Sequence, residues 1–263
     1  MTIAGTNAGR YANSAPSRDT YRTVMTRWTY LGGILLAGIL IIGGYVTAQR
    51  NQEFVVERLA DNLVVIKSDG DGNTAVFIRA NGVVLADTKT LRSGQRLLEV
   101  LRTVTDKPVT HILNTHHHYD HVGGNSFFGS HVEVIVHENA ATRMTSMEEF
   151  STPERKHGLP DRTFKDKLTL FSGDDTIELH HFGPAHTDND AFIVFRGLGI
   201  MHAGDTFPGM NAAVPHGGSP AAYPTTMTRA AEISGVRTVI PGHGPVTNWQ
   251  AFVDNAAALR KGK

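Results

Sequence analysis

The chain contains no cysteine among its 263 residues. Disulfide bonds, thiolate metal ligands and cysteine nucleophiles are therefore excluded, and any bound metal must be held by imidazole and carboxylate groups. An excess of one charge is also absent, because 25 Lys and Arg residues balance 25 Asp and Glu residues. The chain thus lacks the basic composition that is typical of nucleic-acid-binding proteins, and we expect no nucleic-acid partner.

Long apolar runs are absent except for one near the amino end, from Trp28 to Ala48, which contains no charged residue. A run of about 20 such residues can cross a bilayer as a helix. Residues 1–27 carry four arginines and a single acid, which favours a cytoplasmic amino end. We expect 1–27 to be a cytoplasmic arm and 28–48 to be a transmembrane anchor in the inner membrane, with the following domain facing the periplasm or exterior. Val46-Thr47-Ala48 also fits a signal-peptide cleavage site, in which case the domain is secreted or periplasmic.

Residues 51–263 form the main domain and show no internal repeat. Short β-branched runs predict strands at 63–67, 75–79, 83–86, 109–113, 132–136, 168–171, 176–179, 191–195, 199–202 and 238–240. Apolar residues at helical spacing predict helices at 93–104, 138–150, 221–234 and 249–260. Asn81-Gly82 indicates a hairpin turn, and Ser93 is the expected N-cap of the first helix. This order of strands and helices predicts an α/β (α+β) fold with two sheets covered by helices, not a doubly wound parallel sheet.

A histidine-rich loop follows the expected strand 109–113, with the pattern H-x-H-x-D-H. Side chains two positions apart in extended chain point the same way, so His116 and His118 can address one metal. Asp120 and His121 follow the bend and can address a second metal. Several imidazoles with an open position are the composition expected of a catalytic zinc site.

Three further donors stand in Gly- and Pro-rich loops just after expected strands: His186, Asp205 and His243. The carboxyl ends of strands are where α/β sheets tend to place ligands and chemistry. His216, in a Pro-His-Gly-Gly segment, is a candidate substrate contact. His117 is interpreted as a structural or solvent-facing residue and His202 as a packed strand residue. Thr187 and Asp188 either hydrogen-bond the metal ligands or form a local turn.

In this order, the motifs resemble those of the metallo-β-lactamase superfamily over nearly all of residues 54–260. The resemblance implies an αβ/βα four-layer sandwich, here preceded by one hydrophobic helix, with two Zn²⁺ per chain. It implies that His116, His118 and His186 hold the first ion and that Asp120, His121 and His243 hold the second. Asp205 would bridge both, and the family tends to have an aspartate at the position of Asp87.

The implied activity is that of a dinuclear zinc hydrolase acting on a small molecule. A metal-bridging hydroxide would attack a carbonyl-type substrate, which is a lactam, lactone, ester or thioester. Asp120, His186 and His243 are the expected catalytic residues. The alternatives are a mononuclear iron oxidoreductase similar to sulfur dioxygenases, and weak β-lactamase activity as the physiological role. A non-catalytic, membrane-tethered binding module is disfavoured because all seven ligands are present.

The departures from zinc β-lactamases bear on the substrate. Asp205 stands where some of these enzymes use a cysteine ligand. No lysine occurs between Lys167 and Lys261, although these enzymes place one shortly after that ligand to hold the carboxylate of the drug. Efficient β-lactam cleavage is therefore not expected. The sequence does not indicate the oligomeric state.

Overall fold

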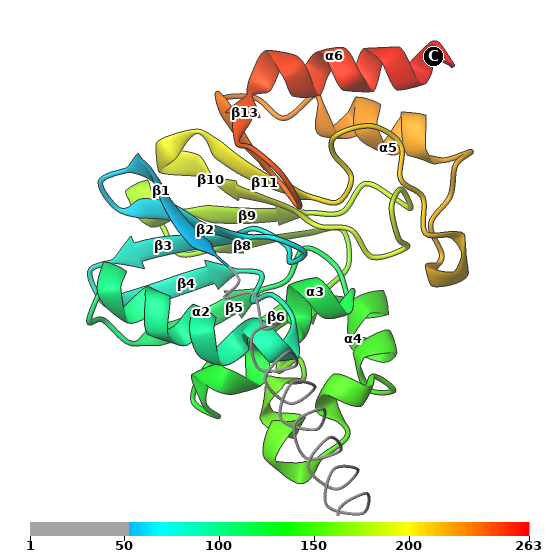
Figure 1. Cartoon of the computed structure of the whole chain (residues 1–263). Helices are drawn as coiled ribbons and strands as arrows, with labels where there is room; N and C mark the ends of the chain where they lie inside the picture. Colours follow the sequence, from blue (N-terminus) through cyan, green and yellow to red (C-terminus); the bar gives the residue numbers. More distant parts are fainter. Residues whose placement is uncertain (1–52, 263) are drawn as a thin grey trace, which may run out of the picture. The chain divides into compact units, whose positions relative to one another are not determined.

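The structure is a computed structural model that describes residues 53–262 (Figure 1). From Glu53 onward the chain forms one compact unit. The predicted arm 1–27 and hydrophobic helix 28–48 lie outside the described residues. Within the described part of the chain, no helix combines the length and the apolar character needed to span a bilayer.

The first sheet contains seven strands, arranged in their order along the chain. They are β1 (Phe54–Ala60), β2 (Leu63–Ser68), β3 (Thr74–Arg79), β4 (Gly82–Ala86), β5 (Val109–Leu113), β6 (Glu133–His137) and β7 (Arg162–Phe164). The strands from β1 to β4 pair antiparallel, whereas β4, β5, β6 and β7 pair parallel. The predicted hairpin lies between β3 and β4, where Arg79 pairs with Gly82.

The second sheet contains six strands in the order β13-β12-β11-β10-β9-β8. They are β8 (Lys167–Leu170), β9 (Ile177–His180), β10 (Phe192–Phe195), β11 (Ile200–Gly204), β12 (Thr238–Pro241) and β13 (Thr247–Asn248). All pairs are antiparallel except β11 with β12, which run parallel.

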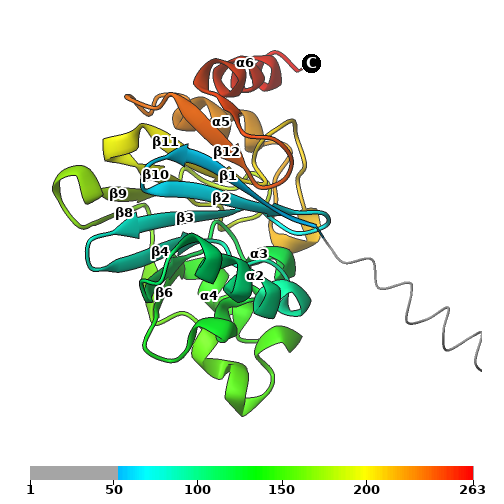
Figure 2. The same ribbon diagram turned by 60° about the vertical axis from the view of Figure 1, so that its left-hand side comes forward.

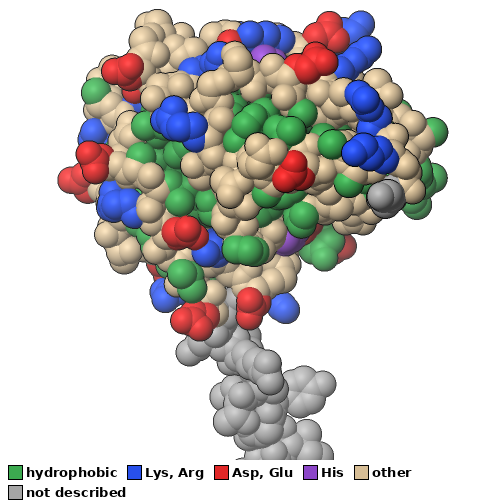
Figure 3. Space-filling view, turned by 90° about the horizontal axis from the view of Figure 1, so that it is seen from above, with side chains coloured by type: hydrophobic (Ala, Val, Ile, Leu, Met, Phe, Trp, Pro, Cys, Tyr) green, Lys and Arg blue, Asp and Glu red, His purple; other side chains and the backbone are tan. Residues whose placement is uncertain are grey.

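The two sheets pack face to face and helices cover their outer faces, as Figures 1 and 2 show. The helices are α2 (Leu91–Val104), α3 (Tyr119–Val122) and α4 (Glu138–Met144) on the first sheet, with α5 (Tyr223–Ala230) and α6 (Trp249–Arg260) on the second. The four layers confirm the predicted αβ/βα sandwich. On the face shown in Figure 3, Lys and Arg side chains are interspersed with Asp and Glu, in keeping with the balanced composition.

Alternation along the strands explains this layering. In β2, Val64 and Ile66 pack toward the helices of the first sheet, whereas Leu63 and Val65 pack between the two sheets. Successive strand side chains point to opposite faces, so a strand that is apolar at every position is buried on both sides. A third apolar cluster lies between the second sheet and α5 and α6.

Several predicted boundaries are wrong. The N-cap of α2 is Thr90, whose Oγ1 accepts from the Ser93 backbone N–H, and Ser93 lies within the helix. The predicted helix 138–150 ends at Met144, because the hydroxyls of Thr145 and Ser146 hydrogen-bond back to the preceding turn. A short 3₁₀ helix, Glu148–Phe150, follows.

The predicted helix 221–234 is shortened to α5. It starts at Tyr223 with Pro224 in its first turn. Backbone N–H groups in the first turn have no acceptor within the helix, so a proline there removes no hydrogen bond. Strands β1, β7 and β13 were not predicted. β1 is a partly exposed edge strand and the other two are three residues or fewer, so none carries a strong apolar pattern.

Candidate metal centre

The seven predicted ligands converge on one edge of the sandwich, where strands of both sheets end. The loop after β5 carries His116 and His118 and leads into α3, which contains Asp120 and His121. His186 lies in the loop between β9 and β10. Asp205 follows β11 and His243 follows β12, and these strands are parallel, so their carboxyl ends lie side by side.

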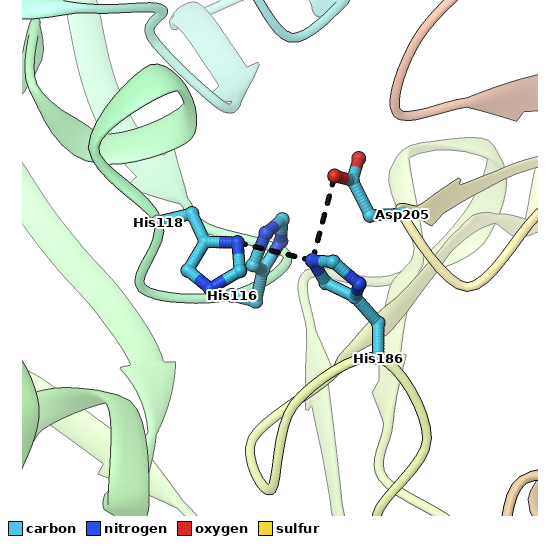
Figure 4. A group of neighbouring side chains, drawn as sticks. All are labelled: His116, His118, His186 and Asp205. Atoms are coloured by element: carbon cyan, nitrogen blue, oxygen red, sulfur yellow. Dashed lines mark hydrogen bonds and ion pairs between the residues drawn. The ribbon is translucent and has the colours of Figure 1, made fainter. Parts of the chain in front are cut away.

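The first cluster consists of His116, His118, His186 and Asp205, whose donor atoms all lie within 4.8 Å of one another. Figure 4 shows the three imidazoles and the carboxylate pointing toward a common centre. His186 Nε2 lies 3.0 Å from His118 Nδ1 and 3.5 Å from Asp205 Oδ2. This set of donors suits a metal that prefers imidazole and carboxylate.

The second cluster consists of Asp120, His121 and His243, again within 4.8 Å. His243 Nε2 lies 3.1 Å from Asp120 Oδ2. Asp205 joins the two clusters, because its Oδ1 lies 3.3 Å from His121 Nε2 and 3.5 Å from His243 Nε2 while its Oδ2 faces His186. The structure thus brings all seven residues together, whereas their role as metal ligands stays a prediction.

Orphaned polar atoms at this centre fit a bound cation. Among the described residues, five buried side-chain N or O atoms have no hydrogen-bond partner, and three of them are His116 Nε2, His121 Nε2 and Asp205 Oδ1. A buried polar atom without a partner costs roughly 1–3 kcal/mol, so native proteins rarely keep three in one place. Bound metal ions would provide partners for these atoms, with His116 in the first cluster, His121 in the second and Asp205 between them.

Hydrogen bonds behind the imidazoles determine which nitrogen faces the centre. His121 Nδ1 lies 2.7 Å from Asp87 Oδ2, and a carboxylate accepts, so Nδ1 carries the proton and Nε2 is left as the donor to a metal. His186 Nδ1 likewise donates to the carbonyl oxygen of Asn211. His118 has the opposite arrangement, because its Nε2 lies 2.5 Å from His216 Nδ1 and its Nδ1 faces the first cluster.

Asp87 is fully buried at the end of β4, with a left-handed φ of 63°. Besides His121, it accepts from the backbone N–H of Thr115 at 2.8 Å and from the Thr115 hydroxyl at 2.7 Å. It therefore holds both His121 and the start of the histidine-rich loop.

Gly72 and Asn73 are two site-supporting residues that the sequence did not indicate. Asn73 donates from its backbone N to the carbonyl oxygen of Gly242 at 2.6 Å, and its Nδ2 donates to those of Pro241 at 2.9 Å and Gly244 at 3.0 Å. Gly72 packs directly on His121, since a Cβ there would lie 2.5 Å from the imidazole Cε1. The only local signal in the sequence is a Gly- and Asp-rich turn, and such a turn does not indicate which residues of the site it contacts.

In the metal-free protein the centre is an ion-paired network. Burial would lower the pKa of His121, but the carboxylates of Asp205 and Asp87 raise it well above its ordinary value. The neighbouring carboxylates of Asp120 and Asp205 raise the pKa of His243 to about 9. Burial alone would raise the pKa of Asp205, yet His121 and His243 hold it far below its usual range. Burial dominates at His116 and lowers its pKa. A metal ion would therefore displace protons from this network.

The other residues that the sequence analysis singled out make contacts outside the two clusters. His117 is buried against Asn189, and its imidazole also lies beside His118 and His216. His202 is buried in β11 with Nε2 3.0 Å from the Asn73 carbonyl oxygen, which is the packed strand position that was predicted. For Thr187 and Asp188 the structure shows the local turn and not hydrogen bonds from their side chains to the metal ligands. The Thr187 hydroxyl donates to Asp190, and the Asp188 carboxylate pairs with Arg143, because the tight turn points both side chains away from the ligands.

The model of the metallo-beta-lactamase superfamily matches residues 68–246, and the chain belongs to this family. The fold is shared with solved structures. A metallo-beta-lactamase from Pontibacter korlensis is 20% identical, with a TM-score of 0.66 over 79% of this chain and 99% of that one. The DIM-1 metallo-beta-lactamase is 17% identical, with a TM-score of 0.65 over 80% and 99% of the two chains.

A third similar structure is the mono-zinc form of the metallo-beta-lactamase FIM-1 from Pseudomonas aeruginosa. It is 15% identical, with a TM-score of 0.63 over 80% of this chain and 96% of that one. Membership of the superfamily makes this chain an enzyme of the metal-dependent hydrolase class, which confirms that prediction and leaves the substrate open.

Proposed function

We propose that the protein is a dinuclear zinc hydrolase of carbonyl-type substrates, a class that comprises lactams, lactones, esters and thioesters. The observation that carries the proposal is the pair of donor clusters joined by Asp205, with orphaned buried atoms in both. A metal-dependent fold with donors for two ions supports hydrolysis better than binding alone, because two ions held there would activate water and polarise a substrate carbonyl.

His116, His118 and His186 would hold the first ion, and Asp120, His121 and His243 the second, with Asp205 shared. When bound, zinc makes water acidic enough to supply a nucleophile near neutral pH and polarises a substrate carbonyl. Asp205 offsets the positive charge of both sites. Its side chain is only 10% exposed, so this charge compensation acts with little screening by solvent.

Asp120 is the residue placed to handle the proton of the attacking water. Its carboxylate is 15% exposed at the centre, and its Oδ2 is held 3.1 Å from His243 Nε2. An oxygen so held can accept a hydrogen bond from water and orient it toward the substrate carbonyl. His186 and His243 approach the centre from the other sheet, and they would fix the relative position of the two sites.

The relatives named metallo-beta-lactamases suggest β-lactams as test substrates. The sequence argues against efficient cleavage of β-lactams, because no lysine that could hold the carboxylate of the drug follows Asp205 until Lys261. We therefore rank lactones, esters and thioesters above β-lactams.

The test combines metal analysis with a substrate panel on the full chain, purified in mild detergent. We expect about two zinc ions per chain and hydrolysis of at least one carbonyl substrate, with activity lost in His118→Ala. His131→Ala, a histidine outside both clusters, is the matched control and should retain metal and activity. One iron per chain without hydrolysis would contradict the proposal and favour the mononuclear iron oxidoreductase.

We also propose that residues 28–48 anchor the enzyme in the inner membrane, with the domain from residue 51 facing the periplasm or exterior. The support is the uncharged run preceded by arginines. Protease added to spheroplasts should degrade the domain, and amino-terminal sequencing of the mature protein should find residues before 28. A mature chain that begins near residue 49 would show a cleaved signal peptide instead.

A further inference from the structure

A cavity of about 280 Å³ opens beside the first cluster. It is lined by His117, His118, Tyr119, Arg143, Ser146, Met147 and His216. His118 belongs to both the first cluster and the cavity wall, because its Nδ1 faces His186 in the cluster and its Nε2 faces His216 on the cavity side. A substrate that reacts at the cluster would therefore extend directly into this cavity.

The size of the cavity indicates what part of a substrate it can take. Pockets for whole small molecules usually measure about 300–1,000 Å³. A volume of about 280 Å³ lies at the lower limit of this range, which fits a side arm whose reacting group lies outside the cavity over the cluster. The Tyr119 ring and the Met147 side chain supply apolar contact area, and both residue types adapt well to alkyl and aromatic groups.

The charge of the cavity wall is neutralised. Among its lining residues only Arg143 is a Lys, Arg, Asp or Glu. Its Nε lies 3.0 Å from Asp188 Oδ1 and its Nη2 lies 2.5 Å from Asp188 Oδ2, which is a two-pronged pair. Asp188 also accepts from Asn189 Nδ2 at 2.7 Å. The guanidinium is thus committed to Asp188 and leaves no free cation for a substrate carboxylate.

We propose that this cavity binds an uncharged acyl side arm and so selects neutral carbonyl substrates over those whose arm ends in a carboxylate. The proposal rests on the proposed hydrolase function. A carboxylate in the cavity would lose water contacts and meet no unpaired cation, whereas an alkyl arm would gain contact with Tyr119 and Met147.

A matched pair of substrates tests the proposal on the metal-loaded full chain. The 4-nitrophenyl ester of hexanoic acid and the 4-nitrophenyl half-ester of adipic acid differ only in a terminal methyl against a terminal carboxylate. We expect the hexanoate to be favoured in kcat/KM by about tenfold, because the terminal carboxylate would lose part of its hydration in the cavity and meet no unpaired cation. Equal values for the two esters would overturn the proposal.

The Arg143–Asp188 pair gives a sharper test. Asp188→Asn leaves the guanidinium without its anion, and the preference should shift toward the adipate half-ester by about tenfold. The double variant Arg143→Met/Asp188→Asn removes both charges and should restore the wild-type preference. Glu99→Gln is the matched control, since it leaves Arg96 without its 3.0 Å partner on α2. An unchanged preference in a folded Asp188→Asn variant would contradict the proposal.

A second variant covers the case in which Asp188→Asn does not fold. Met147→Trp should fill the cavity and raise KM for the hexanoate ester by a much larger factor than KM for the short acetate ester, with metal content as the check that the protein is folded. Equal effects on both esters would overturn the proposal.

Failure of the hydrolase function would be visible separately, as no cleavage of any ester by protein with a full complement of metal. The cavity is then tested by ligand-observed NMR on the metal-free chain, with hexanamide and the monoamide of adipic acid as probes. Binding of hexanamide that is lost in Met147→Trp supports the proposal. Equal binding of the charged probe overturns it.

Discussion

At the scale of single residues, the centre depends on partners that hold the imidazoles from behind. Asp87 is the clearest case, because it is fully buried and binds both His121 and Thr115. Loss of such a partner usually costs a metal site about 10–100-fold in affinity.

We therefore expect Asp87→Asn to weaken the second zinc site by about 10–100-fold and to leave the first site occupied. The amide can present its NH₂ group to His121, and this removes the acceptor that keeps Nε2 free of a proton. Competition with a chromophoric chelator measures the two affinities. Asp106→Asn, at an exposed position, should change neither. Equal weakening of both sites would show that Asp87 acts on folding alone.

The protonation of His243 predicts how metal uptake depends on pH. Its pKa in the metal-free protein is about 9, above the ordinary value of 6.5. The protonated form therefore stabilises the metal-free fold fully below about pH 6.5, and this contribution is lost as pH rises through about 9. Zinc needs the neutral imidazole, so zinc affinity should rise over the same interval.

Calorimetry in buffers of different ionisation enthalpy should detect proton release when zinc binds to the metal-free protein at pH 7. His243→Gln should release fewer protons and show a flatter pH dependence of affinity. If wild type and His243→Gln release the same number of protons, the raised pKa of His243 is wrong.

At the scale of elements, the turn between β2 and β3 links the two sheets at the metal centre. Asn73 makes three hydrogen bonds to the loop that carries His243. The two backbone carbonyls that accept from its side-chain amide lie 168 and 171 residues away along the chain. Gly72 meanwhile packs on His121 and donates to the Asp120 carbonyl oxygen at 3.1 Å. This turn therefore contacts every residue or loop of the second cluster.

Asn73→Ala should lower the free energy of unfolding by about 1–3 kcal/mol, because the carbonyls of Pro241 and Gly244 lose their donor. It should also weaken the second zinc site more than the first. Urea unfolding and zinc stoichiometry measure the two effects, with Asn81→Ala in the exposed hairpin as the control. A stability loss with unchanged affinity for the second zinc would contradict the positioning role.

At the scale of the whole molecule, the centre draws donors from the loops of both sheets. A ligand that binds only the folded state stabilises it in proportion to the logarithm of its concentration over Kd. Bound zinc should therefore connect the edges of the two sheets and contribute to the stability of the whole domain.

Removal of metal with a chelator should lower Tm by several degrees, and added zinc should restore it. Differential scanning calorimetry measures the shift. In His118→Ala the chelator should lower Tm by less, because one ligand of the first ion is already missing. An identical Tm with and without chelator would show that no ion couples the sheets.

The αβ/βα order of the layers and the division of the ligands between two ions came from the resemblance to the family. The sequence alone determined the donor types, the two sheets covered by helices, and the seven donors that follow strand ends. It did so because H-x-H-x-D-H is a local pattern and because strand alternation and helical spacing are read over neighbouring residues. Helix ends were less predictable, since hydroxyl side chains such as Thr145 and Ser146 compete locally with the helix.

Only the tertiary structure decided which nitrogen of each imidazole faces the centre, and that Asp87, Asn73 and His216 stand behind the ligands. It also decided that Asp188 pairs with Arg143 instead of a ligand, which neutralises the wall of the neighbouring cavity. These contacts join residues that are distant along the chain. They depend on how the two sheets pack, and no spacing along the sequence encodes them directly.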